Sequence, residues 1–412
     1  MKGGSIVDKA KIQQSGKAKW AVMVYMAGDN NLDGAALRDI EEMAQIGSTK
    51  DVNVLVQLDR LEDKKTRRFC ITKGGGYEQD CMETFDETNT GDPKVLEDFI
   101  TWSVERYPAE RYFLILWNHG GGWWEEARSR AAALKSPGAR SLHTRSHASL
   151  FHHRTNATGH STHRSICYDD TSSGDALDNS ELKNVLANTC AAIGKKIDIL
   201  GMDACLMTMV EVAWQLRDSV EILVGSEIEE PNDGWPYAEI LQFLTAKPKS
   251  KTHVVAKEVV KQYVASYRDQ DETVTQSALN TAATEDIIRA LIPLTAELLS
   301  DLDKNRKLIQ WAWDHAPKFY DDNYLDLFAF ARKLRTKSKD RDRIREKADA
   351  LIAALKIGIT KAIICQGKLG AEVAGTKGLS IYFPAEYINP AYRRLDFAID
   401  AQWTVFLERY LG

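Results

Sequence analysis

The chain has 412 residues, of which 44% are hydrophobic, so it can bury a large core, and its length suggests two or three structural units. Its 54 Lys and Arg against 59 Asp and Glu give a formal net charge of -5, which supplies no general attraction for nucleic acid or a membrane surface. No run of about 18 apolar residues predicts a membrane span. Residues 1–19 are polar and rich in lysine, so we expect a cytoplasmic protein, or a secreted one whose signal has been removed.

The six cysteines are few for this length and contain no CxxC pair. Neither a disulfide framework nor a zinc-thiolate site is therefore indicated. For any single cysteine, the simplest interpretation is a small buried hydrophobic residue.

Short apolar runs alternate with amphipathic stretches from Trp20 onward, which is typical of a parallel sheet covered by helices. The expected strands are 21–27, 52–58, 68–72, 112–117, 197–201 and 220–225. The expected helices are 35–45, 93–104, 181–192 and 206–216, the last beginning directly after Cys205. The predicted fold class is α/β, with a mostly parallel sheet flanked by helices.

Two changes of pattern divide the chain. Between about 125 and 164 the periodicity stops and Arg, Ser, His and Thr accumulate, which predicts an exposed insertion. After residue 235 the pattern becomes mainly helical, interrupted by strand-like pieces at 273–279 and 378–384. We expect an N-terminal extension (1–19), an α/β core (20–124 and 165–235), the basic insertion (125–164) and a C-terminal helical unit packed on the core (236–412).

Reactive side chains follow two of the expected strands. Asn118-His119-Gly120 comes after the strand at 112–117, and Asp203-Ala204-Cys205 comes after the strand at 197–201. Because ligands bind outside the carboxyl ends of the strands in an open α/β sheet, His119 and Cys205 are predicted to converge there.

This pair has the chemistry of acyl transfer. At the start of a helix, the Cys205 thiol would lie in the positive field of unpaired N–H groups, which favours the nucleophilic thiolate. His119 is suited to move a proton near neutral pH, and the backbone N–H groups of Gly120 and Cys205 are the candidates to bind the oxyanion. The alternatives stay open: a cysteine between strand and helix is often core packing, and a histidine in a glycine-rich turn often only holds the loop.

The two motifs resemble the His-Gly and Ala-Cys motifs of the caspase-like cysteine peptidases and, within that group, the clostripain family. The resemblance extends to YMAGDNNL at 25–32, TGDP at 90–93, YDDTSSGDAL at 168–177, PNDGWPY at 231–237 and GLSIYFP at 378–384. It implies a caspase-like sheet, a Cys205–His119 dyad, and cleavage after a basic residue, Arg in particular. No cofactor is required for this chemistry, and calcium is implied only because some relatives use it.

A buried carboxylate at the base of the first substrate pocket would pair bidentately with an arginine. We expect Asp203 and Asp233 to serve this purpose. The alternative for Asp203 is a cap for the following helix, and the alternative for Asp233 is a turn residue before Gly234.

The resemblance also implies a single chain that is cut between its His and Cys halves, and the basic insertion lies in that interval. We expect self-cleavage there. The candidate sites are Arg128, Arg130, Lys135, Arg140, Arg145, Arg154 and Arg164.

Two sets of residues invite a metal hypothesis. The His pairs of the insertion lack a rigid frame, so a solvated linker is the better interpretation; they are His143 with His147, His152 with His153, and His160 with His163. The acidic run of Asp169, Asp170, Asp175 and Asp178 is compatible with calcium but does not fit an EF-hand loop, and caps and turns explain it equally well.

The sequence thus predicts a cysteine endopeptidase that cuts after Arg, and also Lys, in peptides or proteins. It would be a monomer or a self-processed two-chain form, with no nucleic-acid or membrane partner. The alternative from another class is a catalytically silent protein of the same fold that binds basic peptides. A further alternative, the same fold with acidic or Asn specificity, is disfavoured by the two carboxylates near the nucleophile.

Overall fold

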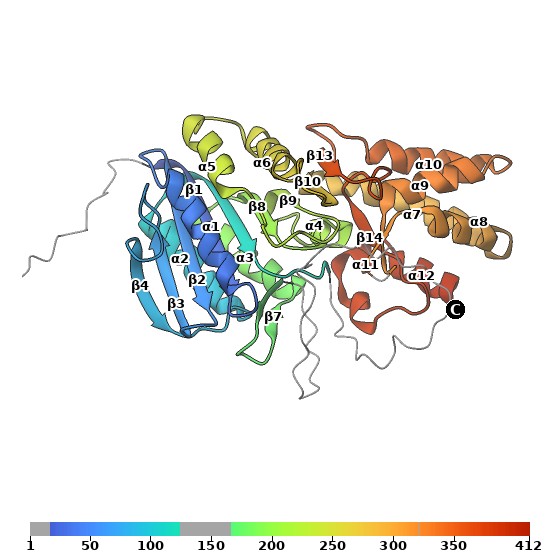
Figure 1. Ribbon diagram of the computed structural model, residues 1–412. Helices are drawn as coiled ribbons and strands as arrows, with labels where there is room; N and C mark the ends of the chain where they lie inside the picture. Colours follow the sequence, from blue (N-terminus) through green and yellow to red (C-terminus); the bar gives the residue numbers. More distant parts are fainter. Residues whose placement is uncertain (1–16, 124–165, 321) are drawn as a thin grey trace, which may run out of the picture.

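The computed structural model describes residues 17–123, 166–320 and 322–412, and its centre is a nine-stranded sheet (Figure 1). The order across the sheet is β13-β10-β9-β8-β5-β1-β2-β3-β4. The strands are β1 (Ala18–Gly28), β2 (Val52–Arg60), β3 (Lys65–Cys70), β4 (Cys81–Asp86), β5 (Ala109–Trp117), β8 (Ile197–Asp203), β9 (Val220–Gly225), β10 (Val274–Asn280) and β13 (Ile363–Leu369).

The middle of the sheet is parallel and its two edges are antiparallel. Strands β9, β8, β5, β1 and β2 pair in parallel, whereas β3, β4, β10 and β13 each pair antiparallel with their neighbours. All nine residues of β2 are buried, as expected for a parallel strand that is covered on both faces. The predicted α/β class with a mostly parallel central sheet is confirmed.

Helices cover both faces of this sheet. On one face α1 (Asp33–Ile46) packs against α5 (Tyr237–Ala246), which in turn packs against α6 (Thr252–Ser266). Helices α2 (Pro93–Arg106), α3 (Asn179–Ile193) and α4 (Val210–Gln215) form a second group. Because the chain continues outward from β1 to β4 and then returns to add β5, β8 and β9 on the other side of β1, right-handed crossovers bring this second group to the opposite face.

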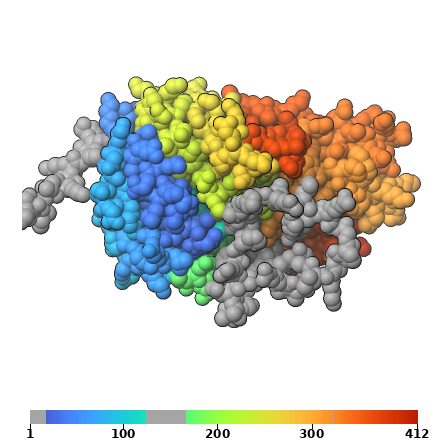
Figure 2. All heavy atoms as spheres, in the orientation of Figure 1, coloured from blue at the N-terminus to red at the C-terminus, as the bar shows by residue number. Residues whose placement is uncertain are grey.

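The main sheet continues past the boundary expected at residue 236, because β10 and β13 join it beside β9. The remaining C-terminal helices form the orange and red half of the molecule in Figures 1 and 2. They are α7 (Thr284–Ser300), α8 (Leu302–His315), α9 (Leu327–Lys337), α10 (Asp342–Ala354), α11 (Asp396–Asp400) and α12 (Trp403–Leu411), with 3-10 turns at η1 (Thr281–Ala283) and η2 (Pro390–Arg394).

Two small sheets complete the fold. One joins β11 (Lys318–Phe319), β12 (Tyr324–Asp326) and β14 (Ser380–Tyr382), and the other joins β6 (Ile166–Asp169) and β7 (Asp175–Leu177). In the part of the chain that the structure describes, no helix has both the length and the apolar character needed to cross a membrane.

One predicted element is wrong in a way that bears on function. The helix expected at 206–216 begins only at Val210 and has six residues. Leu206 adopts a left-handed φ of 66°, and the Leu206 and Thr208 N–H groups donate to carbonyl oxygens of Ile228 and Ser226. The segment after Cys205 therefore pairs with the chain beyond β9 instead of coiling.

Candidate active site

The register between β5 and β8 sets the two candidate catalytic residues side by side. These strands are parallel neighbours, and Trp117 at the end of β5 pairs with Asp203 at the end of β8. His119 and Cys205 each follow their paired residue by two positions. The Asn118 N–H also donates to the Asp203 carbonyl at 3.2 Å, so the two chains stay together beyond the strands.

Gly120 allows the loops that carry His119 and Cys205 to touch. A Cβ atom at Gly120 would lie 2.5 Å from the carbonyl oxygen of Cys205 and 3.0 Å from the Cβ of Ala204. The Tyr324 hydroxyl donates to the Gly121 carbonyl at 2.7 Å, which fastens the same loop to the C-terminal part of the molecule. The glycines after His119 thus permit close backbone packing around the cysteine.

The Cys205 sulfur faces the backbone of Glu230. The Glu230 N–H donates to Sγ at 3.1 Å, and the Cys205 residue is 1% exposed. A backbone N–H aimed at sulfur favours a negatively charged thiolate. This contact replaces the helix N-terminus expected from the sequence, because α4 begins five residues further along.

His119 has a partner that the sequence did not reveal. Its Nε2 lies 2.7 Å from Oδ1 of Asn31, in the turn between β1 and α1, and the histidine is 8% exposed. Because an amide oxygen can only accept, Nε2 carries the proton in this contact and Nδ1 remains the basic nitrogen. Asn31 belongs to the YMAGDNNL stretch, so its presence in a matching motif was the available signal.

Two further asparagines hold the strand ends together. Asn118 Nδ2 donates to the Ala27 carbonyl at 2.5 Å, and Asn118 Oδ1 accepts from the Tyr168 N–H at 2.7 Å. Asn30 Nδ2 donates to the same Ala27 carbonyl at 2.9 Å and to the Tyr168 carbonyl at 3.0 Å. These amides satisfy backbone groups that the ending strands leave unpaired, and so fix the loop that carries His119.

Beside the cysteine lies a buried pair of acids, Asp203 and Glu230. Asp203 Oδ2 accepts from the Tyr237 hydroxyl at 2.8 Å, and burial raises the pKa of Asp203 to about 6. Burial, followed by the charge of Asp203, raises the pKa of Glu230 well above its usual range. Of the two carboxyls, Glu230 thus more strongly favours its protonated form, and Asp203 more readily carries the negative charge. Glu230 was not among the predicted site residues, although it lies within the acidic sequence EIEEP.

The two predicted arginine-binding carboxylates lie in different environments. Asp203 is 5% exposed, whereas Asp233 is exposed in a turn closed by the Gly234 N–H, which donates to the Pro231 carbonyl at 3.0 Å. Gly234 has a φ of 56° and packs against the Asp203 carboxylate. The turn thus places Asp233 at the surface, and its neighbour Gly234 lies against the buried Asp203 carboxylate.

The acidic run of 169–178 separates in space. Asp178 caps α3 in a reciprocal capping box with Glu181, and Asp175 Oδ2 accepts from Asn89 at 2.6 Å. The Asp170 N–H donates to the Asp29 carbonyl, while the Asp169 side chain turns inward. The candidate self-cleavage residues and the six insertion histidines lie outside the described residues.

A histidine and a cysteine brought together by neighbouring parallel strands, with a buried acidic pair beside the thiol, define the class of the caspase-like cysteine peptidases. The chain belongs to the clostripain family, whose family model matches residues 24–135 and 144–410. It is 28% identical over 268 residues to clostripain from Hathewaya histolytica, a match covering 58% of this chain. The chain spans only 44% of the length of that relative.

Solved structures show the same fold. A secreted C11 cysteine protease from Bacteroides thetaiotaomicron, solved with an irreversible peptide inhibitor, matches with a TM-score of 0.64 at 19% identity. An inactive zymogen C11 protease from Parabacteroides distasonis matches with a TM-score of 0.65 at 20% identity. Each match covers 94% of this chain and 99% of the other.

Proposed function

We propose that this chain is an endopeptidase that cleaves peptide bonds after Arg and Lys, with Cys205 as nucleophile and His119 as the proton-transfer group. The observation that carries the proposal is the β5–β8 register, which puts both residues two positions beyond the pair Trp117 and Asp203. The packing of Gly120 against the Cys205 carbonyl supports it, because it brings the loop that carries His119 into contact with the loop that carries Cys205.

The residues divide the chemistry as follows. The Cys205 sulfur attacks the scissile carbonyl, and the backbone N–H groups of Gly120 and Cys205 bind the oxyanion. His119, held through Nε2 by Asn31, delivers a proton to the departing amine. Water then attacks the acyl-enzyme, and the thiolate leaves.

The charges around Cys205 support specificity for a basic side chain. Asp203, Glu230 and Asp39 are buried within one region, and the charges of Asp203 and Glu42 both act on Asp39. A guanidinium entering this region would pair with Asp203 bidentately and draw the proton off Glu230. We assign Asp203 to the base of the pocket and Asp233 to its outer edge.

The decisive experiment compares wild type with Cys205→Ala on a library of peptides, read by mass spectrometry. We expect wild type to cut after Arg and Lys and the variant to cut nothing. Binding of the same peptides without cleavage by wild type would favour the silent-binder alternative. Covalent labelling by an arginyl acyloxymethyl ketone distinguishes the two independently, because only an activated thiolate reacts.

We further propose that the intact chain is a precursor that cuts itself within 125–164. The described structure supports this because Cys205 and His119 are both buried, so a substrate cannot reach the sulfur in this conformation. The insertion also connects β5 to β6, directly after the His119 loop, where its Arg and Lys residues have a high effective concentration at the site.

Self-cleavage is tested by purifying wild type and Cys205→Ala as full chains and following them on denaturing gels. Wild type should convert to two fragments whose new ends lie within 125–164, while Cys205→Ala stays intact. Adding trace wild type to the variant separates cleavage within one chain from cleavage between chains. A wild type that is fully active as one intact chain contradicts the proposal.

A further inference from the structure

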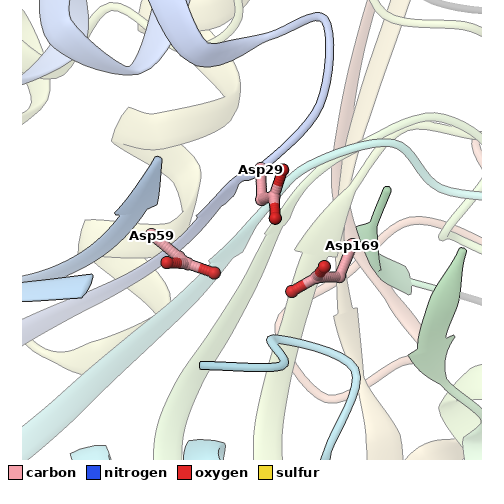
Figure 3. A group of neighbouring side chains, drawn as sticks. All are labelled: Asp29, Asp59 and Asp169. Carbon is pink, nitrogen blue, oxygen red and sulfur yellow. The ribbon is translucent and has the colours of Figure 1, made fainter. Parts of the chain in front are cut away.

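The carboxyl ends of the central strands, where the active site lies, are acidic. Asp29 follows β1, Asp59 is the next-to-last residue of β2, and Asp169 ends β6. Figure 3 shows these three buried side chains pointing toward one another. Asp203, the last residue of β8, adds a further carboxylate at the active site. The acids at this end of the sheet disfavour the binding of an anion there.

The opposite end of the sheet, where the parallel strands begin, contains a cavity of about 600 Å³. The first residues of β9, the start of α6 and the end of β10 contribute to its wall. Strand β8 has seven residues, which span about 23 Å, so the cavity is well separated from Cys205. Its volume lies within the range of roughly 300–1,000 Å³ that is typical of small-molecule sites.

Three cations line this cavity. Arg111 is the third residue of β5, Lys196 directly precedes β8, and Lys251 directly precedes α6. None of the three forms a salt bridge with a described residue. Glu221 is the one acidic side chain in the lining, and the first turn of α6 contains no acid. The lining therefore keeps an excess of positive charge, although the chain as a whole has a formal net charge of -5.

Contacts to backbone carbonyls hold two of these cations in place. Arg111 donates to two carbonyls of the loop before α6, one of them Pro248 at 3.1 Å, and its guanidinium lies over the ring of Trp20. Lys196 Nζ donates to the Arg217 carbonyl at 2.7 Å. Because a guanidinium has five N–H donors and an ammonium has three, these contacts leave donors for an anion.

Aliphatic side chains form another part of the wall. Val220 and Ile222 of β9 and Ile364 of β13 belong to the lining, and each is at most 6% exposed. Ile359, in the turn before β13, also lines the cavity but is 50% exposed. The Gly358 N–H donates to the carbonyl of the first residue of β13 at 2.9 Å, which fixes this turn. The described chain thus leaves an aliphatic surface uncovered beside the cations.

The strand order separates the two parts of the wall. In the order β13-β10-β9-β8-β5, the aliphatic residue Ile364 lies on the first strand, whereas Lys196 and Arg111 lie at the last two. Three strand spacings, about 14 Å, lie between β13 and β8. The cavity therefore has a cationic end and an aliphatic end, and a ligand that contacts both must be elongated.

We propose that this cavity binds an aliphatic carboxylate, a fatty-acid anion, with its carboxylate at Arg111, Lys196 and Lys251 and its chain along Ile359 and Ile364. Arginine and lysine bind carboxylates through charge-assisted hydrogen bonds, and burial of each CH₂ group adds affinity. An inorganic anion would leave the aliphatic wall uncovered, and a neutral lipid would leave the cations unpaired. The acidic carboxyl ends of the strands direct the same anion away from the active site.

The test measures binding directly and does not depend on peptidase activity. Full-length protein is titrated with sodium decanoate by calorimetry, and we expect one decanoate per chain. Neutral decanamide should bind at least tenfold more weakly, because it cannot pair with the cations. Affinity should fall about two- to fourfold for each CH₂ removed between decanoate and hexanoate. Cys205→Ala should bind decanoate as wild type does, because the cavity and Cys205 lie at opposite ends of β8.

Two variants at exposed positions locate the ligand in the cavity. Lys251→Glu should weaken decanoate binding at least tenfold, whereas Lys307→Glu on α8, with the same change in net charge, should alter it at most twofold. Ile359→Ser should weaken binding at least threefold, because it removes part of the aliphatic wall. Ile399→Ser, on α11 at a position that is 63% exposed, is its matched control.

Four results would overturn the proposal. The first is a wild type that binds no decanoate, or that binds decanoate and decanamide equally. The second is loss of decanoate binding in Cys205→Ala, which would place the ligand at the active site. The third is wild-type affinity in both Lys251→Glu and Ile359→Ser. The fourth is inorganic phosphate that competes with decanoate and binds as tightly, which would show that the aliphatic wall contributes nothing.

Discussion

The contact between His119 and Asn31 makes a prediction about a single side chain that touches no substrate. Replacing Asn31 by Ala removes the acceptor for Nε2, so the ring loses its fixed tautomer and orientation. We expect kcat to fall by about 10- to 100-fold, as for other groups that orient a functional histidine, with KM little changed. Steady-state kinetics on an arginyl substrate measure both.

Asn31→Asp provides the matched comparison, because it keeps an acceptor oxygen at the same place and should retain more activity than Asn31→Ala. Asn188→Ala, on the exposed side of α3, should behave as wild type. Equal losses in the Ala and Asp variants would show that Asn31 does not act through His119.

The raised pKa of Asp203 predicts a pH dependence specific to basic substrates. With a pKa of about 6, the carboxyl is increasingly neutral at lower pH, and a neutral carboxyl cannot pair with a guanidinium. We expect kcat/KM for an arginyl substrate to rise as the pH increases from 5 to 7, more steeply than for a citrullyl analogue. The measurement is the ratio of kcat/KM for the arginyl substrate to kcat/KM for the citrullyl analogue between pH 5 and 7.

The Asp203→Asn variant should flatten that ratio and lower kcat/KM for the arginyl substrate by about 100-fold, within the 2–5 kcal/mol that breaking a buried charge pair costs. Asp218→Asn, at an exposed carboxylate, is the control. A variant that still prefers arginine over citrulline by the wild-type ratio would remove Asp203 from the pocket.

Among the elements, the loop after β5 has no room for any side chain at Gly120. An alanine there would place its Cβ 2.5 Å from a backbone oxygen that cannot move without displacing Cys205. We expect Gly120→Ala to lose about 1–3 kcal/mol of unfolding free energy and most of its activity. Gly34→Ala is the matched control, because in α1 a Cβ meets nothing within 4 Å. Equal Tm values for Gly120→Ala and Gly34→Ala would show that the loop can accommodate a Cβ atom at Gly120.

The short helix α4 carries a buried acid that should make stability depend on pH. Glu211 Oε1 accepts from the Tyr382 N–H at 2.9 Å and from the Tyr392 hydroxyl at 2.8 Å, and burial raises the pKa of Glu211 to about 7. The pKa of Glu211 is higher in the folded protein than in the unfolded chain. The protonated carboxyl therefore stabilises the folded state fully below about pH 4.5, and this stabilisation is lost as the pH rises through about 7.

The unfolding free energy of wild type should therefore decline between pH 5 and 8. In Glu211→Gln, which keeps the acceptor oxygen but does not titrate, we expect this decline to be smaller by up to about 3 kcal/mol. Chemical denaturation at several pH values measures this. Glu285→Gln, at an exposed glutamate, should leave the decline as in wild type. A Glu211→Gln profile that parallels wild type would show that Glu211 does not titrate in this range.

At the scale of the whole molecule, the sheet order predicts what self-cleavage would leave behind. A cut within 125–164 would separate β5 from β8 in sequence, but these strands are hydrogen-bonded neighbours in the middle of the sheet. The two fragments should therefore elute as one particle on size exclusion and separate only on a denaturing gel. Fragments that separate under native conditions would contradict this prediction.

Periodicity in the sequence was sufficient for the elements that are buried on a regular face. The strand predicted at 220–225 coincides with β9, and the Asp-Pro cap predicted the start of α2. Strand β4 was missed, because five of its six residues are exposed at the edge of the sheet and show no apolar alternation. The start of α4 was wrong, because tertiary backbone pairing at Leu206 and Thr208 overrides local helical preference.

The sequence by itself determined the α/β class, the strand ends at which His119 and Cys205 lie, and the basic interval between them, because all three depend on local pattern and order along the chain. Only the tertiary structure decided which side chains complete the site. Asn31 at His119, Glu230 at both Cys205 and Asp203, and the cluster of Asp29, Asp59 and Asp169 all unite residues far apart in sequence. Their partnership depends on sheet order and strand register, which periodicity along a single segment does not specify.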